Sequence, residues 1–156
     1  MSTSLTGLSV GSAAPDFELK DQHGAKVSLS SFKGNKNVVV LFIPFAFTGT
    51  CTGELCGLRD DLSSFQNEKT ELLAISCDSP YTQKEFAAKE GFNFSVLSDF
   101  WPHGAASKAF GTFIEEKGFA NRGSFIIDKE GVLRFALYSG MDARNNEDYK
   151  KALAAL

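Results

Sequence analysis

Residues 38–56 read VVVLFIPFAFTGTCTGELC. The apolar run from Val38 to Ile43 is typical of a buried strand. Beyond it, apolar residues recur at helical spacing, at Leu55, Leu58, Leu62 and Phe65. Cys51 therefore lies where a strand ends and a helix begins, and helix N-termini favour anions and lower thiol pKa values. The position predicts a nucleophilic thiolate, with a cysteine packed as a small apolar residue as the alternative.

Strands and helices alternate around this stretch. The first helix is predicted over Gly53 to Asn67. A second apolar strand, Glu71 to Cys77, precedes a helical pattern over Thr82 to Glu90. Strands that alternate with helices indicate a parallel sheet with helices packed against it.

Two hairpins are expected, one at each end of the chain. Strands over Ser124 to Ile127 and Val132 to Leu137 are joined by four residues that include Gly131, which favours an antiparallel hairpin. The turn signal at 21–24 separates two short strands, 17–19 and 26–29, and a final helix is predicted over 147–156. We predict a single α/β domain over residues 1–156, with a mixed sheet, flanking helices and an N-terminal β-hairpin.

Composition excludes several classes of function. The formal net charge of −3 gives no support for binding nucleic acid or an anionic membrane. The longest apolar run, 38–46, is far shorter than the roughly 20 residues of a membrane span, and the first residues lack the features of a signal peptide, so a cytoplasmic location is expected. Three cysteines without a Cys-x-x-Cys pair, two isolated histidines and no glycine-rich phosphate loop predict no metal, flavin or nucleotide cofactor.

Three segments together resemble one known family. Pro44, Thr48 and Cys51 match the pattern Pro-x-x-x-Thr-x-x-Cys, which resembles the active-site motif of peroxiredoxins. Residues 121–128 resemble the strand that carries the family's active-site arginine, here Arg122, and residues 98–104 resemble its Ser-Asp segment. The resemblance extends over about residues 8–156 and points to the alkyl hydroperoxide reductase E subgroup. It implies a thioredoxin-like fold and a thiol-dependent peroxidase.

The resemblance implies a role for each matched residue. The Cys51 thiolate would attack a hydrogen peroxide or organic hydroperoxide oxygen and become a sulfenic acid. Thr48 would bind and orient the peroxide, and Arg122 would stabilise the thiolate and the departing oxygen. Pro44 would shield the thiolate from solvent. The residue types alone also allow a local turn bond for Thr48, a surface ion pair for Arg122 and an ordinary strand end for Pro44.

Three further residues are weaker candidates for the site. Glu54 matches an acidic position of the family, but an acid near a helix start is also a common partner of the helix dipole. Phe47 and Trp101 are expected to line the hydroperoxide pocket, although aromatic residues more often belong to a core or an interface.

Cys56 departs from the pattern of that subgroup and is similar to the resolving cysteine of peroxiredoxin Q, which would form a disulfide with Cys51. Residues five apart on a regular helix have Cα atoms about 8.6 Å apart, whereas a disulfide requires less than about 7 Å. We hypothesise that oxidation unwinds about residues 50–57, where Gly53 and Gly57 lower the cost. Alternatively, Cys56 stays reduced and an external thiol resolves the sulfenic acid. Cys77, at the end of a strand, is expected to be a packing residue.

Two other functions are compatible with parts of the sequence. A thioredoxin-like dithiol–disulfide oxidoreductase would share the fold but normally needs Cys-x-x-Cys, and a non-enzymatic interaction protein has no specific signal. For a peroxidase the resemblance implies an external reductant: thioredoxin, a mycoredoxin-like glutaredoxin or a low-molecular-weight thiol. It also implies a homodimer, with the loop around Trp101 as a plausible contact.

Overall fold

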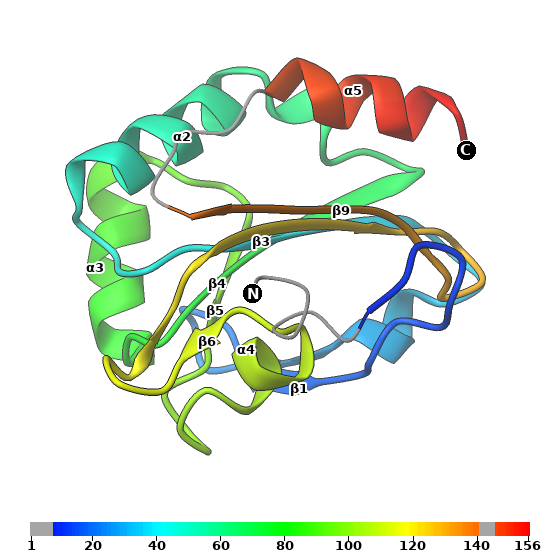
Figure 1. Ribbon diagram of the computed structural model, residues 1–156. Helices are drawn as coiled ribbons and strands as arrows, with labels where there is room; N and C mark the ends of the chain where they lie inside the picture. Colours follow the sequence, from blue (N-terminus) through cyan, green and yellow to red (C-terminus); the bar gives the residue numbers. More distant parts are fainter. Residues whose placement is uncertain (1–7, 141–145) are drawn as a thin grey trace.

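The fold is built on a seven-stranded mixed sheet with the strand order β2-β1-β5-β4-β3-β8-β9 (Figure 1). The computed structural model describes residues 8–140 and 146–156, without the side chains of 50–52, 139 and 140. The strands are β1 (Glu18–Lys20), β2 (Lys26–Ser28), β3 (Asn37–Phe42), β4 (Thr70–Ser76), β5 (Ser95–Ser98), β6 (Phe113–Ile114), β7 (Phe119–Ala120), β8 (Arg122–Ile127) and β9 (Leu133–Gly140). The helices are η1 (Leu29–Phe32), α2 (Gly49–Asp60), η2 (Leu62–Ser64), α3 (Pro80–Glu90), α4 (Ala105–Ala109) and α5 (Asn146–Ala154).

Strand β3 lies in the interior of the sheet and is buried on both faces, which its apolar, β-branched sequence favours. It runs parallel to β4 and antiparallel to β8, with Phe42 opposite Gly123. The C-terminal end of β3 and the N-terminal end of β8 therefore meet at one edge of the sheet. This register brings Arg122 to the place where the chain leaves β3 towards Pro44.

Two separate apolar layers cover the two faces of the sheet. Because side chains alternate along a strand, Val39 and Leu41 face one layer, and Val40 and Phe42 face the other. Helices α2, α3 and α5 contribute to the first layer and α4 to the second. Figure 1 shows α2 and α5 on one side of the sheet and α4 on the opposite side.

The predicted hairpins and the helices that follow β3 and β4 are present, but the first helix differs from its expected bounds. Helix α2 begins at Gly49 rather than Gly53 and ends at Asp60 rather than Asn67. Asp61, with φ −127° and ψ 38°, leaves the helical conformation, and the 3-10 turn η2 follows. The earlier start places both Cys51 and Cys56 within one helix.

Candidate active site

A buried ion pair lies at the sheet edge where β3 ends. The Arg122 Nη1 atom donates to the Glu54 Oε1 atom at 3.1 Å, and the two side chains are only 4% and 7% exposed. Arg122 comes from the first position of β8 and Glu54 from α2, so the pair joins the sheet to the helix. The alternative that the sequence left open for Arg122, a surface ion pair, is wrong: the pair with Glu54 is buried.

The loop between β3 and α2 carries the matched motif. Pro44 is buried, and the half-buried Thr48 donates its hydroxyl to the Phe45 carbonyl at 3.1 Å. Thr48 is the N-cap residue of α2, but its side chain makes no capping hydrogen bond. The Thr48 hydroxyl therefore accepts no hydrogen bond from the backbone amides of the first helical turn. Those amides favour an anion.

Cys51 belongs to the first turn of α2, three positions after the N-cap. Its side chain lies outside the described residues, so the structure places its backbone only. That backbone is at the positive end of a twelve-residue helix, and the first turn carries no acidic side chain. The electrostatic setting expected for Cys51 from the sequence is therefore present.

Asp78 supports the loop and was missed by the sequence analysis. One carboxylate oxygen, Oδ2, accepts hydrogen bonds from the Ala46 amide at 2.8 Å and from the Ser76 hydroxyl at 2.6 Å. These contacts tie the loop after β3 to the end of β4. The available signal was the position of Asp78 directly after a buried strand, because the C-terminal ends of parallel strands meet at one sheet edge.

Phe47 and Trp101, the two aromatic candidates, lie in different surroundings. Phe47 has φ +68°, a region that bulky residues rarely adopt, and its ring packs on Phe86 with centroids 4.9 Å apart. Trp101 is 68% exposed and lines a depression of about 290 Å³ with residues of β1, β2 and β5. Within the described residues, that depression includes none of the motif loop, Glu54 or Arg122. A shared pocket for Phe47 and Trp101 therefore stays a prediction.

Cys56 faces α3 from the middle of α2. Its half-buried thiol donates to the Glu90 Oε1 atom at 3.5 Å. Burial, the hydrogen bond to Glu90 and nearby acidic charges raise the pKa of Cys56, while Arg59 opposes the shift. At neutral pH the helix therefore holds Cys56 as a thiol.

Cys77 lies at the end of β4, with its sulfur 3.9 Å from the Ser107 hydroxyl. Burial, with a smaller contribution from Asp99, raises the pKa of Cys77 to about 11. This environment disfavours a reactive thiolate and fits the expected packing role.

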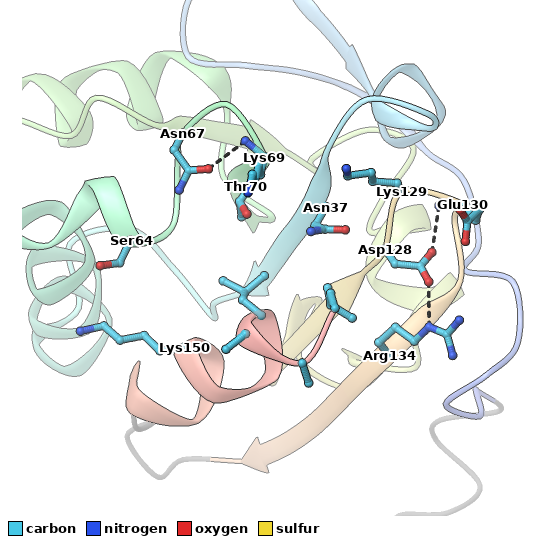
Figure 2. Close-up of a pocket in the computed structure, with 14 residues that line it drawn as sticks. Asn37, Ser64, Asn67, Lys69, Thr70, Asp128, Lys129, Glu130, Arg134 and Lys150 are labelled. Carbon is cyan, nitrogen blue, oxygen red and sulfur yellow. Dashed lines mark hydrogen bonds and ion pairs between the residues drawn. The ribbon is translucent and has the colours of Figure 1, made fainter.

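A large open cavity of about 1000 Å³ lies at the other end of the sheet (Figure 2). Its lining includes Asn37 at the start of β3, Thr70 at the start of β4 and the β8–β9 turn with Asp128, which pairs with Arg134 at 2.7 Å. It contains no candidate site residue. Among residues 8–140 and 146–156, no cluster of three or more His, Cys, Asp or Glu could hold a metal ion, and no helix is long and apolar enough to cross a membrane.

Comparison with known proteins identifies the class. The model of the AhpC/TSA family matches residues 10–136, so the chain belongs to this family of thiol-dependent peroxidases, the peroxiredoxins. The thioredoxin-like fold and the peroxiredoxin resemblance predicted from the sequence are confirmed.

Particular relatives share almost the whole chain. It is 49% identical over 150 residues to alkyl hydroperoxide reductase E of Mycobacterium tuberculosis (strain ATCC 25618 / H37Rv), covering 96% of this chain and 98% of the relative. The crystal structure of peroxidoxin BcpB from Mycobacterium tuberculosis aligns with a TM-score of 0.85 and 30% identity, covering 96% and 98% of the two chains. The reduced 2-Cys peroxiredoxin of Plasmodium vivax aligns with a TM-score of 0.81 and 27% identity, covering 94% of each chain.

Proposed function

We propose that the protein reduces hydrogen peroxide and organic hydroperoxides at Cys51, with Arg122, Thr48 and Pro44 as the other residues of the site. The observation that carries this proposal is the buried Arg122–Glu54 pair, which holds a permanent positive charge at the edge of the sheet where α2 begins. A guanidinium and a helix N-terminus both favour negative charge on a nearby thiolate and on a departing oxygen. The name of the 49% identical relative supports the substrate class.

The proposed reaction is a two-electron oxidation of sulfur. The Cys51 thiolate attacks the nearer peroxide oxygen, an S–O bond forms and the O–O bond breaks. The departing oxygen takes the electron pair and a proton and leaves as water or an alcohol, and Cys51 becomes a sulfenic acid. Thr48 orients the peroxide through its hydroxyl, and Pro44 limits access of water to the sulfur.

Rapid-mixing kinetics test these assignments. Cys51→Ser is expected to abolish peroxide consumption, whereas Cys77→Ser, the control for loss of a thiol, should keep it. Persistent turnover by Cys51→Ser would reject Cys51 as the nucleophile.

We further propose that Cys56 resolves the sulfenic acid. The Cys56 sulfur attacks the Cys51 sulfur, the S–S bond forms, and the hydroxyl leaves as water with the thiol proton. Both cysteines lie in α2, where the estimated Cα separation of about 8.6 Å is too long for a disulfide, so the first turns must unwind. Intact mass after one equivalent of peroxide is the test. A loss of two mass units with a Cys51–Cys56 peptide supports the proposal, and a stable gain of one oxygen favours an external thiol.

The reductant, location and assembly of the enzyme are also proposals. We infer a cytoplasmic enzyme that is recycled by thioredoxin, a mycoredoxin-like glutaredoxin or a low-molecular-weight thiol. Phe100 and Trp101, 57% and 68% exposed, form an apolar surface that suits a homodimer contact. Light scattering should then give twice the chain mass for the wild type and a lower mass for Trp101→Ala. An equal mass for both proteins would reject this contact.

A further inference from the structure

The C-terminal half of α3 contacts residues 47–56, which include both α2 cysteines, at several points. In the loop before α2, Phe47 packs on Phe86 of α3, and the Lys89 ammonium lies 5.9 Å from the centre of the Phe47 ring. Within the helix, the Cys56 thiol donates to the Glu90 carboxylate at 3.5 Å. Most of the residues expected to unwind, 50–57, lie between these contacts. Helix α3 therefore contributes, beside the sheet, to the surface on which the folded form of α2 rests.

Arg59 makes a different kind of contact with the last turn of α3. Its Nη1 atom donates to the Glu90 carbonyl at 2.6 Å, and its side chain reaches Gly91, the C-cap residue of α3. A cation at the C-terminus of a helix interacts favourably with the free carbonyls and the dipole. Arg59 lies beyond the residues expected to unwind, so its contact can persist while the Cys56–Glu90 contact breaks.

We propose that Glu90 is a positioning residue for the resolving step: it holds Cys56 on α3 and thereby limits the rate at which Cys56 reaches oxidised Cys51. This inference rests on the proposed resolving role of Cys56. The reaction can proceed only when Cys56 leaves Glu90, because its sulfur must travel to a cysteine five residues earlier on the same helix. A stronger Cys56–Glu90 contact therefore means slower formation of the Cys51–Cys56 disulfide, here called bridging, and a longer-lived sulfenic acid on Cys51.

The contact also predicts a particular pH dependence. The charged and polar groups around the Cys56 thiol are Glu90, Arg59 and Asp60. Burial, Glu90 and Asp60 raise the pKa of Cys56 in the folded helix, and Arg59 opposes the shift. A raised pKa means that the contact is fully stabilising below the ordinary thiol pKa of 9.0 and is lost as the pH rises through the raised value. The bridging rate should climb with pH and level off at the pKa that Cys56 has on the folded helix.

The experiment compares Glu90→Gln with Glu85→Gln, a matched change at an exposed position of the same helix. Peroxide is mixed with reduced protein, and samples are quenched with acid and alkylated to follow sulfenic acid and disulfide separately. Removing the charge should speed bridging at pH 7 by about three- to tenfold, the range expected for one ordinary hydrogen bond, because Gln loses the charge but keeps an acceptor oxygen. Sulfenic acid formation should be unchanged. Removing the charge should also move the midpoint of the pH profile to lower pH. A variant that only loosened α2 would speed bridging without moving the midpoint.

A second measurement does not require turnover. In a Cys51→Ser background, alkylation of Cys56 by iodoacetamide against pH reports the Cys56 pKa directly, with Cys77 as an internal reference. Glu90→Gln should lower the Cys56 midpoint and leave the Cys77 midpoint in place. Equal Cys56 midpoints in the wild-type and Gln forms would overturn the proposed role of Glu90.

The outcomes separate the proposals from one another. Bridging with the same rate and midpoint in Glu90→Gln and Glu85→Gln overturns only the role of Glu90. Peroxide consumption without any Cys51–Cys56 bridge in the wild type overturns both the resolving role and the role of Glu90 but leaves the peroxidase intact. Absence of peroxide consumption in the wild type overturns the proposed function itself.

Discussion

Replacing Glu54 by Gln tests the buried ion pair at the site. At an effective dielectric constant of about 20, opposite charges 3.1 Å apart attract by about 5 kcal/mol. Two effects reduce the net loss: Gln keeps an acceptor oxygen worth about 1 kcal/mol, and the desolvation cost of the carboxylate disappears. We expect the free energy of unfolding to fall by about 2–3 kcal/mol for Glu54→Gln, and by about 3–5 kcal/mol for Glu54→Ala, which leaves Arg122 buried without this carboxylate.

Urea unfolding measures the loss of stability, and stopped-flow kinetics measure the effect on the reaction with hydrogen peroxide. With a slope near 2 kcal/mol per molar urea, the unfolding midpoint of Glu54→Gln should fall by about 1–1.5 M. The rate constant with hydrogen peroxide should fall by about tenfold, because the guanidinium loses the negative charge that helps to orient it. Glu115→Gln is the control, since its side chain is 73% exposed and its contact with Lys108 is a surface ion pair. Equal unfolding midpoints and rates for Glu54→Gln and the wild type would refute this reasoning.

Three further predictions concern other positions. Arg122→Lys keeps the charge but loses the planar fork, so sulfenic acid formation should slow by about 10²-fold; a change below twofold would contradict the role of Arg122. Asp99, fully buried, accepts hydrogen bonds from the Ala106 amide and from the Ser107 amide and hydroxyl, so Asp99→Ala should lower the free energy of unfolding by about 2–4 kcal/mol in urea titrations. An unchanged urea midpoint would count against this account of Asp99. Burial raises the pKa of Cys77 from 9.0 to about 11, so its contribution to stability is complete below pH 9 and declines as the pH rises towards 11. Thermal melts over this pH range should fall less steeply for Cys77→Ala than for the wild type, and parallel curves would contradict the assignment.

The sequence predicted those parts of the fold that depend on long, regular apolar patterns. The runs that became β3, β4 and β8 are buried on both faces, and such strands leave a continuous signal. Short elements left little signal in the sequence. Strand β5 has four residues and α4 has five, too few for a hydrophobic periodicity to be recognised. The early start of α2 was missed because Gly49 and Thr50 are weak helix formers, whereas α2 is stabilised by packing of Leu55 and Leu58 on the sheet.

The residues of the site could be predicted only where they belong to a recognised sequence motif. Arg122 and Glu54 could be proposed from their positions, but their mutual contact depends on the antiparallel register of β3 and β8. The supporting contacts of Asp78 and Glu90 join segments more than 30 residues apart in the sequence. The partners in such contacts have no local signature, because only the folded chain brings them together.

The division of the site between β8 and α2 has a thermodynamic consequence. Arg122 belongs to a strand whose residues are all buried, whereas the helix that carries Cys51 must partly unfold in every proposed cycle. Turnover would then include the refolding of a helix, and mild denaturant would act on the two half-reactions in opposite directions. Low urea should hasten disulfide formation, because it favours the opened helix, and slow the reaction with peroxide, which requires the closed one.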